Sequence, residues 1–120
     1  MLSAAQCVFL EAHRVARLAT VDGRGEPHAV PVCFALVAGA IYTPLDRKPK
    51  RVPVTRLRRV RDLTQNPAVC LLVDDYSEDW RRLAWLQARG RGELVEPGQA
   101  EHAGAIVALR RRYQQYETMD

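Results

Sequence analysis

Residues 15–43 read VARLATVDGRGEPHAVPVCFALVAGAIYT, and this stretch decides the fold class of the chain. Residues 15–22 and 28–37 are rich in apolar and β-branched residues, and the turn-forming sequence DGRG at residues 22–25 separates them. A second short turn leads into a third apolar segment over residues 40–43. Because parallel strands need a long crossover connection, three strands joined this closely are predicted to run antiparallel.

Three helices are predicted outside this stretch. The first covers residues 4–13, where Ser3 and Gln6 form a capping box ahead of apolar residues at helical spacing. The second begins near residue 54 and ends at an Asn-Pro pair. The third follows Pro97.

Two further strands complete the pattern. The continuous apolar run over residues 68–73 has the length of a strand, and its lack of alternation predicts burial on both faces. An acidic loop over residues 74–79 leads into a long strand over residues 83–95. The order is typical of a mainly β (α+β) fold, a small antiparallel barrel with flanking helices, although five strands are few for closure.

Composition restricts the class of protein. The 120 residues are 48% hydrophobic and 27% charged, which suits a single domain over residues 1–120. No apolar run reaches the ~20 residues of a membrane-spanning helix. The N-terminus lacks the pattern of a signal peptide, so a cytoplasmic location is expected. The three cysteines and three histidines are scattered, which predicts neither a disulfide framework nor a metal site.

Basic residues concentrate in one segment. Eight of the fifteen residues from Arg47 to Arg61 are Lys or Arg, in a chain with a formal net charge of +4. Such a segment suits a solvated helix face, a nucleic-acid footprint or a phosphate-binding site. Aromatic residues that would stack on bases are missing from it, which disfavours nucleic acid. The residues by themselves leave the choice open.

Few single residues indicate chemistry. Pro31 cannot donate to a strand ladder, so it marks a sheet edge or a bulge. His28 is interpreted as a half-exposed residue at a strand end rather than as a catalytic base. Trp80 and Trp85 suit a core or its rim, and either ring would also cover a planar ligand.

The combined pattern resembles a known family. Residues 15–51, with LRRVRDLTQNPAVCLLVDDYSEDW at 57–80 and WLQARGRGEL at 85–94, are similar to the pyridoxamine 5′-phosphate oxidase-like family of flavin- and deazaflavin-binding proteins. The KPKR sequence at residues 48–51 and the segment over 66–80 look most like the actinobacterial branch of F420-dependent oxidoreductases. The similarity covers about residues 8–116.

The resemblance implies a fold and an assembly. The family fold is an antiparallel split β-barrel of the FMN-binding type with six strands, and the cofactor lies in a groove at the interface of a homodimer. Family chains continue beyond the last helix into a final barrel strand. The present sequence ends at residue 120, so the resemblance implies that this strand is missing.

The resemblance also implies where the cofactor binds. The ring system would lie along the second strand, and basic residues after the third strand would hold the phosphate. Counting forward from the third strand along the family pattern selects Lys48, Lys50 and Arg51, whereas counting back from the Asn-Pro pair selects Arg58 and Arg59. Of these, Lys50 and Arg51 are ranked first and Arg59 next. The implied set is His28, Val30, Pro31, Val32 and Cys33 along the strand, Tyr42 and Thr43 beside the phosphoribityl chain, Lys48, Lys50, Arg51, Arg58 and Arg59 at the phosphate, and Trp85 near the ring.

The function implied is that of a deazaflavin (F420)-dependent oxidoreductase, which moves a hydride between the reduced cofactor and a small organic substrate. FMN is the alternative cofactor, and the extended basic loop favours the longer anionic tail of F420. A non-catalytic flavin- or deazaflavin-binding protein of the same fold is a second alternative. A small nucleic-acid-binding barrel is a third, less favoured one. No residue is identified as a required acid or base, and no metal is implied.

Overall fold

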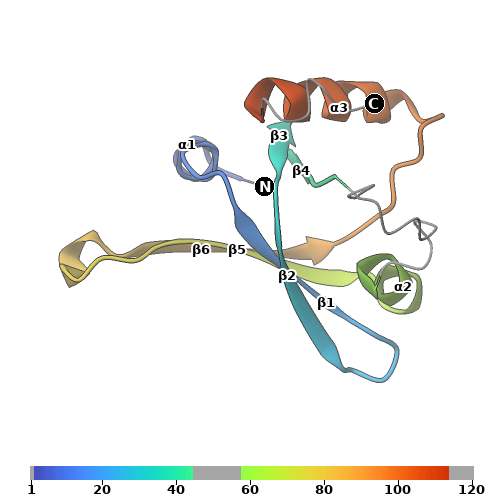
Figure 1. Ribbon diagram of the computed structural model, residues 1–120, viewed down its shortest axis with the longest axis horizontal. Coiled ribbons are helices and arrows are strands. Elements are labelled where there is room, and N and C mark those ends of the chain that lie inside the picture. The colour runs from blue at the N-terminus through green and yellow to red at the C-terminus, as the bar shows by residue number, and fades with distance from the viewer. Residues whose placement is uncertain (1, 45–57, 114–120) are drawn as a thin grey trace. The chain divides into compact units, whose positions relative to one another are not determined.

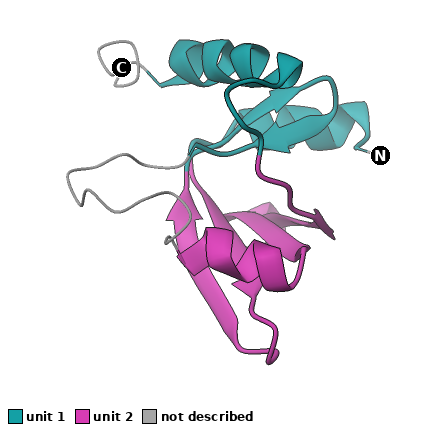
Figure 2. Cartoon of the chain, turned by 90° about the vertical axis from the view of Figure 1, so that its right-hand side faces the viewer, with its two compact units in different colours: residues 1–14, 33–44, 95–120 teal, residues 15–32, 45–94 magenta. Residues whose placement is uncertain are grey.

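The computed structural model describes residues 2–44 and 58–113 of the 120-residue chain. Its elements group into two compact units, which are described in turn (Figure 2). Figure 1 labels the helices and strands of both units. Unit 1 comprises residues 1–14, 33–44 and 95–120, and unit 2 comprises residues 15–32 and 45–94.

Unit 2 is built on a four-stranded antiparallel sheet. Its elements are β1 (Ala16–Val21), β2 (Pro27–Val32), helix α2 (Arg58–Gln65), β5 (Ala68–Asp75), the 3₁₀ helix η2 (Trp80–Arg82) and β6 (Ala84–Arg91). The strand order is β2-β1-β5-β6, so β2 is an edge strand, as Pro31 predicts. The predicted turn between β1 and β2 is confirmed. Asp22 Oδ1 accepts hydrogen bonds from the backbone N–H groups of Arg24 and Glu26, at 2.8 and 2.9 Å.

One face of this sheet forms the core of unit 2. Ala16 and Val73 are fully buried, and Leu71 is 5% exposed. Helix α2 packs against β1 and buries Val60, which is 3% exposed. The predicted start of this helix near residue 54 lies outside the described residues.

Gly92, directly after the end of β6, allows a close approach of the backbone to its neighbours. Its N–H donates to the Pro67 carbonyl oxygen at 2.8 Å. A Cβ at this position would lie 2.6 Å from Leu63 Cδ2 and 3.0 Å from Val69 Cγ1. Only a residue without a side chain fits the backbone between α2 and β5 without displacing these side chains.

Unit 1 combines two helices with a two-stranded hairpin. Its elements are α1 (Ala4–Glu11), β3 (Ala35–Val37), β4 (Ala40–Tyr42) and α3 (Ala100–Arg112). The predicted capping box is confirmed, because the Ser3 hydroxyl accepts from the Gln6 N–H at 3.1 Å and the Ser3 N–H donates to Gln6 Oε1 at 2.8 Å. Helix α3 packs on β3, where Ala35 and Leu109 are both 3% exposed.

The prediction of one strand over residues 28–37 is wrong. The chain leaves the four-stranded sheet after Val32 and enters the two-stranded sheet at Ala35. In the segment that joins β2 to β3, the Phe34 N–H donates to the Tyr113 hydroxyl at 3.1 Å, and this hydroxyl lies 3.0 Å from the Phe34 carbonyl oxygen, to which it can donate. The Tyr113 hydroxyl thus satisfies the Phe34 backbone groups that a neighbouring strand would otherwise pair with. The described residues contain six strands rather than five, in an otherwise correctly predicted order.

Three further predictions in unit 2 need correction. Asp74 and Asp75 belong to β5 rather than to an acidic loop, because the ladder between β5 and β6 continues through them. β5 is not buried on both faces, since Leu71 and Val73 are buried and the alternate residues are only half-buried. The strand predicted over residues 83–95 ends at Arg91.

Candidate functional site

The strand predicted to face the cofactor ring is the edge strand β2. His28, Val30 and Val32 share one face of it, and burial increases from the half-buried His28 to Val32, which is 8% exposed. Pro31 lies on the opposite face and is exposed. An edge strand leaves its outer N–H and C=O groups without ladder partners, and such groups can hydrogen-bond the polar edge of a flat ring.

A buried carboxylate ties helix α2 to this sheet. Asp62 is 2% exposed, and its Oδ2 accepts a hydrogen bond from the Thr20 hydroxyl at 2.7 Å. Its Oδ1 accepts a hydrogen bond from the Arg58 Nε at 3.3 Å. Thr20 is the cross-strand partner of His28. The structure therefore brings two predicted site residues, His28 and Arg58, to the same end of unit 2.

The turn at this end carries a second carboxylate. Hydrogen bonds from the backbone N–H groups of Glu26 and Arg24 lower the pKa of Asp22. The positive charge of Arg58 lowers this pKa further. Arg58 thus pairs with Asp62 and also acts electrostatically on Asp22.

Arg59 differs from its neighbour Arg58. The Arg59 Nε is buried and has no hydrogen-bond partner among the described residues. Burying a guanidinium N–H without an acceptor is costly, and an anionic oxygen would satisfy it with a charge-assisted hydrogen bond. Of the two arginines, only Arg59 thus has a buried side-chain donor without a partner among the described residues.

Unit 1 holds the other predicted contacts. Cys33 is half-buried and packs against the cluster of Ala35, Leu109 and Tyr113. Tyr42 ends β4, and its hydroxyl donates a hydrogen bond to Glu101 Oε2 at 2.6 Å.

The hydrogen bond to Glu101 raises the pKa of Tyr42, and desolvation and the negative charge of the carboxylate act in the same direction. Replacing Glu101 by Ala removes the acceptor and the charge. We therefore expect the Tyr42 phenolate to form at a lower pH in this variant, in an alkaline absorbance titration. Glu93→Ala, at another exposed acidic residue, is the control and should leave the titration curve unchanged. An unchanged curve in Glu101→Ala would contradict the pairing.

The predicted site residues are divided between the two units. Those on β2, α2 and β6 lie in unit 2, whereas Cys33, Tyr42 and Thr43 lie in unit 1. Trp85 is 69% exposed. The pairing of the strands puts His28 on the same face of the sheet as Val73 and its partner Leu86. Trp85, next to Leu86 along β6, therefore lies on the opposite face. Lys48, Lys50 and Arg51 lie outside the described residues.

Two residues of the site were not singled out from the sequence. Asp62 is the only acidic residue of α2 and follows Arg58 by four positions. This spacing is typical of an exposed ion pair on a helix surface. Glu101 lies in the first turn of α3, where acidic residues are common for electrostatic reasons. Neither position carried a signal of burial or of pairing with a distant residue.

No helix in the described part of the chain combines the length and the apolar character that a membrane crossing requires.

Comparison with curated proteins finds a reductase. The chain is 33% identical over 75 residues to the 5a,11a-dehydrotetracycline/5a,11a-dehydrooxytetracycline reductase of Streptomyces rimosus. The match covers 58% of this chain and 46% of the reductase, so the chain spans about half the length of this curated relative.

Solved structures share the fold. A conserved hypothetical protein of Mycobacterium tuberculosis matches 94% of this chain and 65% of its own, with a TM-score of 0.75 and 24% identity. A haem-binding protein of Mycobacterium smegmatis matches 99% of this chain and 47% of its own (TM-score 0.71, 23% identity). A FAD-binding protein of Mesorhizobium loti matches 99% and 79% (TM-score 0.70, 22% identity). At these identities the similarity establishes the split-barrel type of fold and nothing more.

The sequence model of the pyridoxamine 5′-phosphate oxidase family matches residues 2–119, which is nearly the whole chain. The mixed α+β architecture with its antiparallel sheet agrees with this match. The chain therefore belongs to the pyridoxamine 5′-phosphate oxidase family.

Proposed function

We propose that the chain is an oxidoreductase that binds a phosphate-bearing flavin-type cofactor, with coenzyme F420 as the expected cofactor and FMN as the alternative. Family membership and the reductase relative support this class of activity. The observation that carries the proposal is the buried Arg59 Nε, which has no partner among the described residues. A phosphate oxygen at this nitrogen would remove the cost of burying it.

The residues of the chain would bind and orient the cofactor, which itself supplies the hydride transfer. The outer edge of β2 around Pro31 would hydrogen-bond the ring. Arg59, together with Lys50 and Arg51, would hold the phosphate. Tyr42 would lie beside the phosphoribityl chain, with its hydroxyl fixed by Glu101.

The choice of F420 over FMN rests on charge. FMN ends in a single phosphate, whereas F420 carries a longer anionic tail. The eight basic residues from Arg47 to Arg61 offer more cationic groups than one phosphate needs. The haem-binding neighbour makes haem a third ligand to include in any titration.

We further propose a homodimer with the cofactor groove at its interface, and a single domain over residues 1–120 that acts in the cytoplasm. The reductase relative supports hydride transfer from the reduced cofactor to an organic substrate, rather than the reverse reaction. A non-catalytic binding protein of the same fold would bind the cofactor without turnover.

The test is a fluorescence titration with F420 and with FMN, and an absorbance titration with haemin. We expect saturable micromolar binding of F420 by the wild-type chain, with FMN weaker. Arg59→Ala should raise the dissociation constant for F420 by about 10- to 100-fold, because a charge-assisted hydrogen bond is lost. The Lys50→Ala/Arg51→Ala double variant should also weaken binding.

The matched control is Arg111→Ala, which removes an exposed arginine from α3, outside the basic segment from Arg47 to Arg61. It should change the dissociation constant by no more than about twofold, as expected for an exposed charge. An unchanged affinity in Arg59→Ala would reject the phosphate assignment. Binding of haemin alone, or of no ligand, would reject the flavin-type cofactor.

A further inference from the structure

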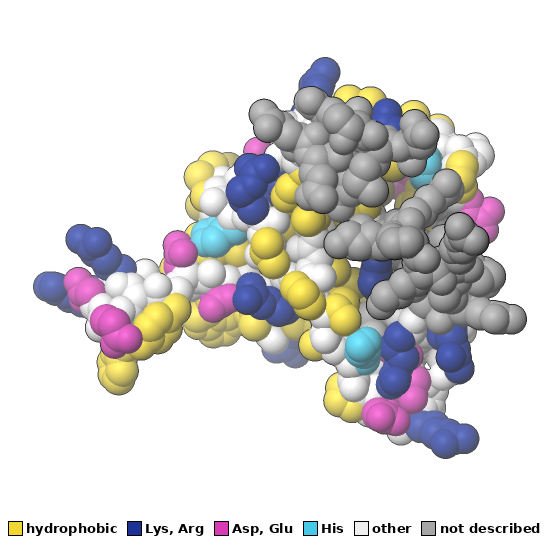
Figure 3. Space-filling model, in the orientation of Figure 1, with side chains coloured by type: hydrophobic (Ala, Val, Ile, Leu, Met, Phe, Trp, Pro, Cys, Tyr) yellow, Lys and Arg dark blue, Asp and Glu magenta, His cyan; other side chains and the backbone are white. Residues whose placement is uncertain are grey.

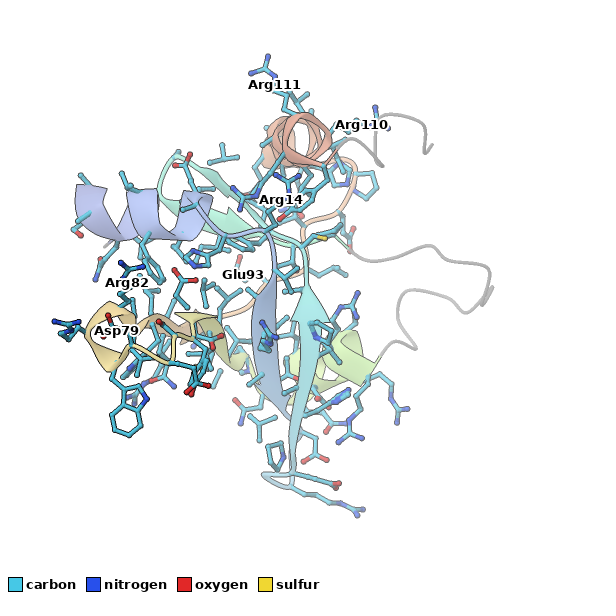
Figure 4. The ribbon with its side chains drawn as sticks, turned by 60° about the vertical axis from the view of Figure 1, so that its left-hand side comes forward. Arg14, Asp79, Arg82, Glu93, Arg110 and Arg111 are labelled. Atoms are coloured by element: carbon cyan, nitrogen blue, oxygen red, sulfur yellow. The ribbon has the colours of Figure 1, made fainter. Side chains whose placement is uncertain are left out.

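Two arginines of unit 1 lie where its two helices end. Arg14 follows shortly after the end of α1, and Arg112 is the last residue of α3. The Arg14 guanidinium lies 5.1 Å from the centre of the Tyr113 ring, and the Arg112 guanidinium lies 5.5 Å from the same centre. Figure 4 shows Arg14 beside α3, whereas Arg110 and Arg111 point away from this helix. Two positive charges therefore meet at one aromatic side chain.

Hydrogen bonds and stacking hold the Arg112 side chain in place. Its Nε donates to the Tyr113 hydroxyl at 3.0 Å, and its Nη1 and Nη2 donate to the carbonyl oxygens of Glu11 and Leu10 at 3.2 and 3.4 Å. The guanidinium also stacks 4.7 Å from the centre of the buried Phe34 ring. A guanidinium has five N–H groups, so these contacts leave two of them without a partner among the described residues.

Arg14 makes fewer contacts and is exposed. Its side chain donates to the Arg112 carbonyl oxygen at the end of α3. Each arginine therefore caps the helix that precedes the other one, which is a favourable position for a positive charge. The single hydrogen bond leaves most of the Arg14 N–H groups without a partner in the described part of the chain.

The charge of this arginine pair is only partly balanced. Within residues 2–44 and 58–113, the acceptors that Arg14 and Arg112 contact are carbonyl and hydroxyl oxygens, and no ion pair joins either arginine to a carboxylate. Each helix C-terminus carries about half a negative charge, so the two helix ends offset about one of the two positive charges. Because Arg112 is half-buried, water compensates its charge incompletely. About one positive charge thus remains for an anion to neutralise.

We propose that Arg14 and Arg112 form an oxyanion-binding site at the junction of α1 and α3, with a phosphate group as its ligand. The planar fork of a guanidinium matches the oxygens of carboxylate and phosphate. A carboxylate offers two oxygens, whereas a phosphate group offers at least three and carries up to two charges, and so suits two forks. Figure 3 shows Lys and Arg side chains at the surface in the region of α1 and α3.

This site is separate from the proposed cofactor contact. Arg14 and Arg112 belong to unit 1, whereas Arg59, which is proposed to hold the cofactor phosphate, belongs to unit 2. The inference is therefore independent of the proposed function, and the two sites are tested by different variants.

The test is a titration of the full chain with inorganic phosphate at constant ionic strength, followed by NMR of the arginine Nε–Hε groups. We expect a saturable shift of the Arg14 signal with a dissociation constant of about 1 mM, the range of a few charge-assisted hydrogen bonds. Acetate should bind more weakly, and equal binding of acetate would contradict the preference for phosphate. Tighter binding of glycerol 3-phosphate would assign the site to a phosphate monoester, and equal or weaker binding would assign it to free phosphate.

Variants identify the residues that bind. Arg14→Ala should raise the dissociation constant by about 10-fold or more, read from the Arg112 signal, because charge-assisted hydrogen bonds are lost. Arg112→Lys keeps the charge and loses the planar fork, and should weaken binding by about threefold or more, read from the Arg14 signal. The matched control is Arg111→Ala, which removes an exposed arginine of α3 and should change the constant by no more than about twofold. Far-ultraviolet circular dichroism confirms that each variant is folded.

Three results would each overturn the proposal: a shift that does not saturate, an equal shift with sodium chloride, and an unchanged dissociation constant in Arg14→Ala. Arg59→Ala should retain phosphate binding at Arg14, and Arg14→Ala should retain F420 binding. A loss of F420 binding in Arg14→Ala would contradict the separation of the two sites. A chain that binds phosphate at Arg14 and no F420 would contradict the proposed cofactor and support the oxyanion site.

Discussion

Replacing Tyr113 by Phe is expected to lower the free energy of unfolding by about 2–4 kcal/mol, a large effect for the loss of one oxygen atom. The Tyr113 hydroxyl accepts from the Phe34 N–H at 3.1 Å and from the Arg112 Nε at 3.0 Å. It lies 2.7 Å from the Arg14 carbonyl oxygen, to which it can donate. Phe34 is fully buried, so its N–H would be left without an acceptor in an apolar environment.

The surroundings of Tyr113 add to the expected loss. The Arg112 guanidinium stacks 4.7 Å from the centre of the Phe34 ring and also donates to the carbonyl oxygen of Glu11 at 3.2 Å, at the end of α1. Arg14 donates to the Arg112 carbonyl oxygen in return. The hydroxyl is therefore part of a network that joins the ends of α1 and α3 to the start of β3, and its removal loosens more than one contact.

Urea unfolding of Tyr113→Phe measures this effect. Tyr76→Phe is the control, because Tyr76 is 67% exposed and loss of its hydroxyl should cost less than about 0.5 kcal/mol. Equal stability of Tyr113→Phe and the wild type would contradict the role of the hydroxyl in unit 1.

Replacing Asp62 by Ala is expected to destabilise the chain by about 2–4 kcal/mol. The change leaves the Thr20 hydroxyl, on a residue that is 4% exposed, without its acceptor. It also removes the ion pair to Arg58, whose side chain is 44% exposed, and this pair contributes less because solvent screens it. Asp62→Asn keeps an acceptor oxygen and should recover part of the loss.

A double-mutant cycle separates the pair from its surroundings. Thr20→Val removes the donor, and once Asp62 is Ala this second change should cost less than it does in the wild type. We expect a coupling of about 1–2 kcal/mol between Thr20 and Asp62 from thermal or urea unfolding of the four proteins. Additive losses would mean that the 2.7 Å hydrogen bond contributes nothing to stability.

The same contact explains why part of the candidate site could not be predicted. Counting back along the family pattern from the Asn-Pro pair selects both Arg58 and Arg59, with Arg59 ranked ahead, but it gives no structural reason to separate them. The structure separates them: Arg58 pairs with Asp62, while the Arg59 Nε is buried without a partner among the described residues. Asp62 follows Arg58 by four positions, a spacing typical of an exposed ion pair, and nothing local marks it as buried.

Local patterns in the sequence determined much of this protein. The DGRG turn, the capping box at Ser3, the edge position of Pro31 and the antiparallel pairing all follow from neighbours within a few residues, whose backbone preferences and hydrogen bonds are local. The residue pattern was also sufficient to indicate the family. Only the tertiary structure decided where the strand over residues 28–37 breaks, because Phe34 meets the Tyr113 hydroxyl across 79 positions of sequence. It likewise decided that Thr20 faces Asp62 and that both tryptophans stand in solvent, since burial depends on which distant segments pack together.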